Sequence, residues 1–147
     1  MRYYEVRMVN NDLFKALDLK IVTPDGLIYD GQAEKLIVRT TGGDVCILAR
    51  HMDYVAPLGM GQAIVEANGK RRIAACIGGM LSVSNYEVTL VPTTFEWAEA
   101  IDMERAQRSY DRADKILHDE GATDTDIALA EARLHRALVR KSVASFK

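Results

Sequence analysis

Four arginines in the last third of the chain have spacings that would bring their guanidinium groups together on α-helices. Arg105 and Arg112 are seven positions apart, about two helical turns, and Arg136 and Arg140 are four positions apart. Each pair therefore shares one helix face, where like charges repel one another unless an anion lies between them. The pattern is compatible with an anion-binding site. The alternative is a solvated basic face that pairs with acidic side chains, and spacing alone favours that alternative.

Other residues that often take part in chemistry lack suitable neighbours. His51 and Asp53 suggest acid–base chemistry, but no nucleophile or metal ligand stands near them in the sequence. We therefore expect no catalytic residue, no metal site and no catalytic activity in the chain by itself. The two cysteines, Cys46 and Cys76, have no Cys-x-x-Cys spacing. Both fall in strand-like runs, so we expect a pair of reduced, buried, small apolar residues.

The composition is typical of a globular protein and predicts neither nucleic-acid binding nor a membrane span. Of the 147 residues, 48% are hydrophobic and 27% are charged, and the formal net charge is -2. This charge predicts no electrostatic surface for nucleic acid. Purely apolar runs are only a few residues long, so we expect no direct membrane insertion. Residues 1–18, in which polar residues interrupt any apolar core of a signal peptide, are expected to form an N-terminal extension.

A change of hydrophobic period near residues 96–106 separates the elements that must position the arginines. Before it, apolar residues alternate every two positions, and after it they recur every three to four, so strands are followed by helices. Strands are predicted over Leu19–Thr23, Leu27–Asp30, Glu34–Thr41, Asp44–Ala49, Tyr54–Leu58, Gln62–Ala67, Arg71–Ile77, Met80–Val83 and Tyr86–Val91. Asn68-Gly69 and Ser84-Asn85 are expected as tight turns, and Gly78-Gly79 as a bend or a close backbone approach. Such short strands indicate an antiparallel sandwich or barrel.

The helical part is predicted to be an antiparallel hairpin. Asp102 is the expected N-cap of the first helix and Gly121 its C-terminal stop. Thr123 or Asp124 caps the second helix, which runs to about Ser145. The apolar stripes comprise Ala106, Tyr110, Ala113 and Leu117 on the first helix and Ile127, Ala130, Leu134 and Ala137/Leu138 on the second. Alanine-rich stripes pack closely but bury little area, at about 25 cal/mol per Å², so we expect a marginally held hairpin.

Four segments, in this order, resemble the epsilon subunit of the F-type ATP synthase. They are Leu19–Tyr29, Gly43–Leu48 followed by His51, Ile77–Val83 and Ile101–Ala106. The last segment, Ile101-Asp102-Met103-Glu104-Arg105-Ala106, matches the family's (Ile/Leu)-Asp-x-x-Arg-Ala motif, and the resemblance extends from Leu19 to Lys147. The chain departs from the family in one loop, where Ala49-Arg50-His51-Met52-Asp53 stands in place of the usual Pro-Gly-His-x-Pro.

The resemblance implies a ten-stranded antiparallel β-sandwich over residues 19–95 and an antiparallel α-helical hairpin over residues 96–147. It implies a non-catalytic rotor subunit in the central stalk of a proton-driven ATP synthase, peripheral to the cytoplasmic face of the bacterial plasma membrane. The sandwich is then expected to bind the gamma subunit and the ring of membrane c subunits. The hairpin is expected to lie folded on the sandwich or to extend toward the alpha/beta catalytic head, where it inhibits ATP hydrolysis.

In some bacterial members of this family the folded hairpin binds one regulatory ATP without hydrolysing it, although no cofactor is required. The residues of this chain that match that site are Glu96, Ile101, Asp102, Arg105, Ala106, Arg112, Arg136 and Arg140. A triphosphate would supply the anion between the arginines, and Glu96 and Asp102 would hydrogen-bond the adenine and ribose. The arginines can also dock onto acidic residues of the catalytic head, and the two roles are compatible.

A second hypothesis comes from a different class of protein. It is a free-standing β-sandwich that binds a small ligand and dimerises through its helical hairpin. This hypothesis predicts a homodimer indifferent to gamma, whereas the rotor subunit copurifies with a gamma-type coiled-coil protein.

Overall fold

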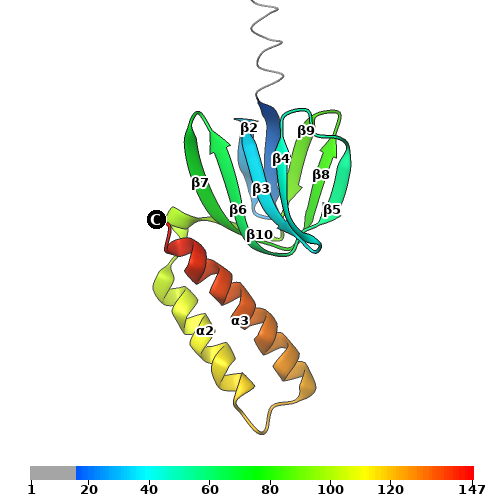
Figure 1. Ribbon diagram of the computed structural model, residues 1–147. Coiled ribbons are helices and arrows are strands. Elements are labelled where there is room, and N and C mark those ends of the chain that lie inside the picture. The colour runs from blue at the N-terminus through cyan, green and yellow to red at the C-terminus, as the bar shows by residue number, and fades with distance from the viewer. Residues whose placement is uncertain (1–15) are drawn as a thin grey trace, which may run out of the picture.

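The chain folds into two β-sheets packed face to face, with a two-helix hairpin projecting from one end of them (Figure 1). The computed structural model describes residues 16–147. The N-terminal extension expected over residues 1–18 therefore lies almost wholly outside the described residues, and the first strand begins at Leu17. The expected architecture, a ten-stranded β-sandwich followed by a helical hairpin, is confirmed.

The ten strands are divided equally between the two sheets. They are β1 (Leu17–Thr23), β2 (Gly26–Ala33), β3 (Lys35–Thr40), β4 (Gly43–Leu48), β5 (Tyr54–Pro57), β6 (Met60–Ala67), β7 (Lys70–Ile77), β8 (Met80–Ser84), β9 (Glu87–Val91) and β10 (Thr94–Trp97). Their order is β2-β1-β9-β8-β5 in one sheet and β10-β7-β6-β3-β4 in the other. β1 and β9 pair in parallel, whereas the other neighbouring strands of residues 16–147 pair antiparallel. β10 was not predicted, because four residues are too few to show an alternating pattern.

Alternating burial along the strands creates the core between the two sheets. In β1, Leu17, Leu19 and Ile21 are buried, and the residues between them are exposed. The same period places Leu81 of β8 and Leu90 of β9 in the core cluster. A sheet with one apolar face must cover it, so the two sheets pack together and form the sandwich.

The two cysteines lie in different environments, so the prediction that both are buried is wrong for one of them. Cys76 on β7 is buried, and burial raises the pKa of its thiol to about 12. Cys46 on β4 is exposed, because the strand's alternation turns the adjacent Ile47 toward the core and the cysteine away from it. Both are free thiols.

Two tight turns use left-handed backbone conformations. Asn68 and Gly69, between β6 and β7, have φ angles of 53° and 70°, which confirms the predicted hairpin turn. The turn between β8 and β9 is displaced by one residue from the prediction. Asn85 and Tyr86 occupy it, with φ angles of 51° and 67°, and Ser84 still belongs to β8. The strand pairing sets this position, which the polar residues alone indicate only approximately.

Gly79 is required by a close backbone approach, as predicted for Gly78-Gly79. Its φ is 91°, and a Cβ atom at this position would lie 1.9 Å from the carbonyl oxygen of Val91. No side chain fits within that distance. The glycine therefore allows the start of β8 and the end of β9 to come together.

The loop that departs from the family pattern keeps a glycine-like backbone conformation. Arg50, which stands where the family usually has glycine, has a φ of 61°. Its guanidinium carbon lies 5.5 Å from the centroid of the Tyr86 ring, a cation–π distance. Beside it, His51 Nδ1 is 2.7 Å from the carbonyl oxygen of Met52. These contacts accompany a left-handed conformation that arginine adopts at a cost.

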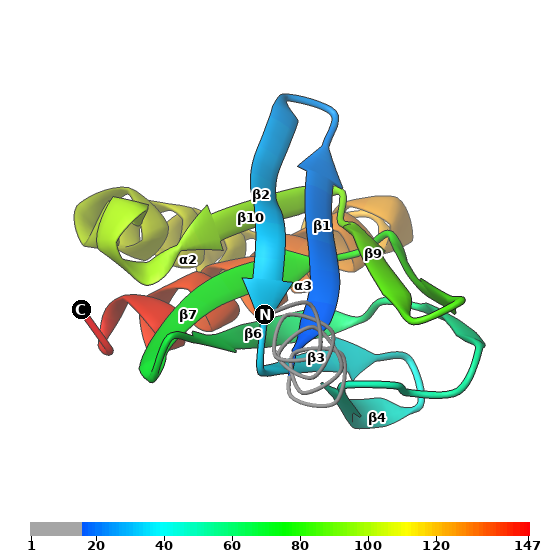
Figure 2. The same ribbon diagram turned by 90° about the horizontal axis from the view of Figure 1, so that it is seen from above.

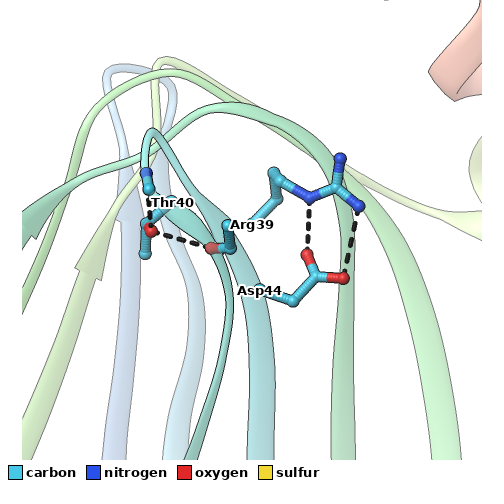
Figure 3. Close-up of polar contacts among 5 residues, drawn as sticks. Arg39, Thr40 and Asp44 are labelled. Atoms are coloured by element: carbon cyan, nitrogen blue, oxygen red, sulfur yellow. Dashed lines mark hydrogen bonds and ion pairs between the residues drawn. The ribbon is translucent and has the colours of Figure 1, made fainter.

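The turn between β3 and β4 is held by polar side chains (Figure 3). Thr40 Oγ1 donates a hydrogen bond to the carbonyl oxygen of Gly43 at 2.7 Å and accepts one from the amide of Gly42 at 3.2 Å. Arg39 donates from Nε and Nη2 to the two carboxylate oxygens of Asp44, at 2.5 and 3.2 Å. The bonds from Arg39 lower the pKa of the Asp44 carboxyl, and they join two residues that lie opposite each other in the β3–β4 pairing.

The helical part contains a short 3₁₀ helix, η1 (Ala98–Ala100), and two α-helices, α2 (Met103–Leu117) and α3 (Asp124–Ala144). Asp102 caps α2 by accepting a hydrogen bond from the Arg105 amide at 3.1 Å, as predicted. Thr123 and Asp126 form a capping box at the start of α3. The prediction that Gly121 ends the first helix is wrong. The helix ends at Leu117, and the Gly121 amide instead donates to Asp119 Oδ1 at 3.0 Å.

Alanines form the contact between α2 and α3. Ala106 and Ala113 of α2 and Ala130 and Ala137 of α3 are buried, whereas Leu138 is 45% exposed. Seen from above, the two helices lie side by side on the far side of β7 and β10 (Figure 2). Among residues 16–147, no helix has the length and apolar character needed to cross a membrane.

The hairpin meets the sandwich through a second, smaller apolar cluster. Its buried members are Ala75, Ala98, Ile101, Val143 and Ala144. They come from β7, from η1 and the residue that follows it, and from the end of α3, which contacts β6, β7 and η1. Only the sandwich-facing ends of the helices are fixed in this way. The rest of the hairpin extends away from the two sheets (Figure 1).

Candidate functional site

A cavity of about 650 Å³ lies between the sandwich and the hairpin. Sandwich residues that line it are Thr23, Asp25, Ile28, Ile77, Thr94, Phe95 and Glu96. Hairpin residues that line it are Arg105, Ser109, Arg112, Ala113, Ile116, Arg133, Arg136, Ala137 and Arg140. The cavity therefore combines an apolar wall with five arginines and two carboxylates.

The helical period explains how the hairpin turns its arginines toward one place. Arg105 and Arg112 of α2 are two turns apart, and the intervening Ser109 also lines the cavity. Arg136 and Arg140 occupy successive turns of α3. The structure thus brings all four predicted arginines to a single cavity, together with Glu96. Neither helix could assemble this set by itself.

Glu96 of β10 and Arg140 of α3 form a direct polar link between the sandwich and the second helix of the hairpin. Arg140 Nε donates to one carboxylate oxygen at 2.7 Å, and Nη2 donates to the other at 3.3 Å. The Arg140 side chain is only 17% exposed, against 38% for Glu96. Such a two-bond pair, partly shielded from water, is stronger than an exposed one. Arg140 is therefore neutralised within the chain.

The other arginines of the cavity have no such partner. Arg105, Arg112, Arg133 and Arg136 form neither a hydrogen bond nor an ion pair through their side chains with any residue between 16 and 147. By contrast, Arg108 of α2, which does not line the cavity, lies 4.0 Å from Glu104. Several unpaired guanidinium groups around one space create a positive potential that favours an anionic ligand.

Three residues that match the family's ATP site do not line the cavity. Ile101 and Ala106 are buried, in the second apolar cluster and between the helices respectively. Asp102 is exposed and caps α2. The hydrogen bond from the Arg105 amide, aided by the positive charges of Arg108 and Arg105, holds the pKa of the Asp102 carboxyl below its usual range. In this conformation these residues fix the start of the helix that presents Arg105.

Two charged residues of the cavity were missed from the sequence. Arg133 lies one helical turn before Arg136 and faces the same way, so its spacing carried a local signal. Asp25 belongs to the turn between β1 and β2, about eighty positions before Arg105. No local pattern could place it near the hairpin. Only the tertiary structure brings these two residues together.

The arrangement suits binding rather than bond-breaking. Phe95 and Ile28 offer an apolar surface to a planar group, and the arginines offer charge-assisted hydrogen bonds to phosphate oxygens. Glu96 offers an acceptor at the sandwich end. Among residues 16–147, no three His, Cys, Asp or Glu side chains are grouped as ligands for a metal.

Both parts of the chain match models of known families. The model described as the ATP synthase delta/epsilon chain beta-sandwich domain matches residues 16–98. The model described as the ATP synthase delta/epsilon chain long alpha-helix domain matches residues 99–145. The boundary between the two matches falls in η1, where the strands give way to helices.

Individual proteins show the same likeness. The ATP synthase epsilon chain of Bacillus velezensis is 42% identical over 130 residues, which cover 88% of this chain and 98% of that protein. The ATP synthase epsilon chain of Ruminococcus albus is 40% identical over 130 residues, which cover 88% of this chain and 96% of that protein. A chain in the Euglena gracilis mitochondrial ATP synthase, in a structure of OSCP, F1 and c-ring, shares the fold with a TM-score of 0.78 at 20% identity, covering 90% of this chain and 82% of that one.

Proposed function

The chain belongs to the ATP synthase delta/epsilon family, and from this premise we propose that it acts as a non-catalytic rotor subunit whose hairpin regulates the enzyme. Family models match both the sandwich and the helices, which favours this role over a free-standing ligand-binding module that dimerises through its hairpin. In this proposal the sandwich couples proton flow to ATP synthesis, and the hairpin regulates ATP hydrolysis.

In the proposed role the sandwich binds the gamma subunit and the c-ring in the central stalk. Support comes from chains of similar fold in structures described as containing F1 with c-ring or central stalk with c-ring. The second of these, from Tetrahymena thermophila, has a TM-score of 0.57 at 13% identity. The chain would then couple proton flow to ATP synthesis at the cytoplasmic face of the bacterial plasma membrane.

Inhibition of ATP hydrolysis is assigned to the extended form of the hairpin. Its support is the small apolar contact between the hairpin and the sandwich. To the buried part of this contact, α3 contributes only Val143 and Ala144. An element held by few contacts can populate a second position at modest cost in free energy. Deleting residues 101–147 should raise ATP hydrolysis by the assembled enzyme and preserve binding to gamma. Unchanged hydrolysis after this deletion would argue against an inhibitory hairpin.

We assign regulatory ATP binding to the cavity between the sandwich and the hairpin. The observation that carries this assignment is the set of four arginines, from both helices, that face one space and whose side chains form no hydrogen bond or ion pair with residues 16–147. ATP bound there would contact both helices and the sandwich. It would therefore favour the folded form by RT ln(1 + [ATP]/Kd).

Calorimetric titration of the full chain with ATP tests this assignment. The double variant Arg136→Ala/Arg140→Ala should abolish the heat of binding, because it removes the unpaired Arg136 guanidinium and leaves the Glu96 carboxylate without its partner, where it repels phosphate. The matched control is Arg108→Ala, which removes an arginine of α2 that does not line the cavity. Equal ATP affinity in the double variant and the control would refute the assigned site.

A further inference from the structure

The segment that joins the sandwich to the hairpin alternates between two sets of contacts. Phe95 belongs to the core cluster of the sandwich, and the Trp97 ring packs against that cluster. The residues that follow each of these two meet the hairpin instead: Glu96 is bonded to Arg140 of α3, and Ala98 is buried in the second apolar cluster. A strand turns successive side chains to opposite sides. This alternation separates contacts within the sandwich from contacts that depend on α3.

Arg72 of β7 holds this segment from the sandwich side. Its guanidinium carbon lies 3.7 Å from the centroid of the Trp97 ring, and its Nη2 donates a hydrogen bond to Glu99 Oε1 of η1. The bond from Arg72 holds the pKa of the Glu99 carboxyl below its usual range. The ion pair is exposed and weak by itself, but stacking on the ring and the pairing of Trp97 with Ala74 in the β10–β7 ladder add to it. All of these contacts are made by β7, β10 and η1.

The end of α3 supplies the bonds and buried side chains that hold the hairpin on the sandwich. Val143 and Ala144 are buried in the second apolar cluster, and Arg140 forms its two-bond pair with β10. Just beyond the helix, Lys147 Nζ donates a hydrogen bond to the carbonyl oxygen of Ile101. Release of the hairpin breaks these contacts, whereas it leaves those of β7 with β10 and η1 in place.

Two residues with extended backbone separate η1 from α2. Ile101 has φ -75° and ψ 127°, and Asp102 has φ -84° and ψ 104°. The Ile101 amide donates to Ala98 of η1, and the Asp102 carbonyl oxygen accepts from the Ala106 amide of α2. Rotation about ψ of Ile101 and φ of Asp102 therefore leaves these bonds of both helices intact and breaks the bond from Lys147. Residues at the ends of elements absorb such rotations in hinges.

We propose that Arg72 clamps the joining segment to the sandwich and that the hairpin swings about the peptide group between Ile101 and Asp102. This inference rests on the proposed mobile hairpin, and it adds where the hairpin turns and which residue fixes that point. Arg72 is a positioning residue. It keeps Trp97 and Glu99 on β7 whether the hairpin is folded or extended, so α2 leaves the sandwich from a fixed place.

Trp97 is the single tryptophan of the 147-residue chain, so its fluorescence reports on the joining segment. Acrylamide quenching and small-angle X-ray scattering are measured on the full chain and its variants. Val143→Asp, which releases α3, should enlarge the radius of gyration and leave the quenching of Trp97 unchanged. Arg72→Ala uncovers one face of the ring, so it should raise the quenching constant about twofold or more and leave the radius unchanged.

Two further variants control for side effects of the substitution. Arg71→Ala removes the neighbouring exposed arginine of β7, and it should change neither measurement. Arg72→Lys keeps the charge and the aliphatic stem but lacks the planar fork, so its quenching constant should be intermediate. Arg72→Lys also replaces Arg72→Ala in the comparison if circular dichroism shows that the alanine variant disturbs the sandwich.

The result that overturns the inference differs from the one that overturns the mobile hairpin. If Val143→Asp enlarges the radius and also raises the quenching of Trp97, the chain turns before Trp97, so the pivot is wrong and the mobile hairpin stands. Native quenching in Arg72→Ala and Arg72→Lys overturns the clamp. A native radius in Val143→Asp overturns the mobile hairpin and the pivot together.

Discussion

At the scale of single residues, the ion pairs of this chain differ in what they can contribute. Arg39–Asp44 is exposed, with both side chains about half accessible, so water screens it. Glu96–Arg140 is more shielded and joins two elements that are distant in sequence. It neutralises one arginine of the cavity and leaves the others to a ligand. In the proposed function, this asymmetry, rather than the total charge, is what favours an anionic ligand in the cavity.

The two thiols should react at very different rates. Cys46 is exposed, whereas Cys76 is buried and its thiol pKa is raised to about 12, so little of its reactive thiolate forms near neutral pH. A thiol reagent such as dithionitrobenzoate should modify one cysteine rapidly in the native chain and the second only in denaturant. Cys46→Ser should abolish the rapid phase. Rapid modification of both thiols in the native protein would contradict the assigned burial.

Two glycines with positive φ should respond differently to substitution by alanine. At Gly79 a Cβ atom would lie 1.9 Å from a backbone oxygen, so Gly79→Ala should lower the free energy of unfolding by roughly 3 kcal/mol or more. At Gly69 no atom lies within 4 Å, so Gly69→Ala should cost only about 1–2 kcal/mol, from backbone strain. Urea denaturation measures both. Equal losses would show that close approach does not require Gly79.

At the scale of elements, each helix of the hairpin combines a sparse buried stripe with a well-formed N-terminal cap. The buried stripe positions of α2 are two alanines, which offer little apolar area. Asp102 at the start of α2 and the Thr123–Asp126 box at the start of α3 instead satisfy amides that the helix leaves free. These caps define where each helix begins. We expect these carboxylate caps to make the hairpin sensitive to acid.

Acidification should weaken the hairpin in a defined pH window. Hydrogen bonds from backbone amides, of Arg105 and Thr123 respectively, lower the folded-state pKa of Asp102 and Asp126 below the ordinary value of 3.8. Their stabilisation is therefore complete above the unfolded-state pKa of about 3.9 and is lost as the pH falls through the lower, folded-state pKa. Thermal melts followed at a helical wavelength should show the melting temperature falling between about pH 5 and pH 2.

The variant Asp102→Asn/Asp126→Asn checks the origin of this acid sensitivity. Asparagine still caps a helix but does not titrate, so the double variant should show a flatter dependence of melting temperature on pH. A profile identical to that of the native chain would assign the acid sensitivity to other groups.

At the scale of the whole molecule, a sandwich with a large apolar core is joined to the helical hairpin by a small apolar contact. The sandwich core draws on both sheets, whereas the second cluster has five buried residues, three of which are alanines. Hydrophobic stabilisation scales with buried area, at about 25 cal/mol per Å². On buried apolar area alone, we expect separation of the hairpin from the sandwich to cost far less free energy than separation of the two sheets. A ligand in the cavity, which touches both parts, opposes that separation.

A charge placed in the second cluster should release the hairpin without unfolding the sandwich. Val143 is 1% exposed, so Val143→Asp would bury an unpaired carboxylate unless the helices move away. Small-angle X-ray scattering should show a larger radius of gyration. Leu138→Asp, at a position of α3 that is 45% exposed, is the matched control and should leave the radius unchanged. A native radius in Val143→Asp would indicate a more firmly attached hairpin.

Local patterns in the sequence determined much of this protein. The alternation of apolar residues identifies the strands, Asn68-Gly69 identifies one hairpin turn, and Asp102 and Thr123 identify the helix starts. Each signal depends on residues only a few positions apart, because a dihedral preference or a cap acts within one turn. The helical spacing of the arginines is likewise a local signal, because it depends on residues within two turns of one helix.

Tertiary structure decided which of those faces meet. It placed Asp25, of the turn between β1 and β2, in the lining of the same cavity as arginines near the end of the chain. It also made Arg140, among five arginines, the partner of Glu96. Tertiary structure also adds β10 to the second sheet. This strand has only four residues, too few to show an alternating pattern in the sequence. A periodic pattern specifies the face of an element but not the element opposite. The cavity exists because packing of the sandwich and hairpin closes around residues separated by most of the chain.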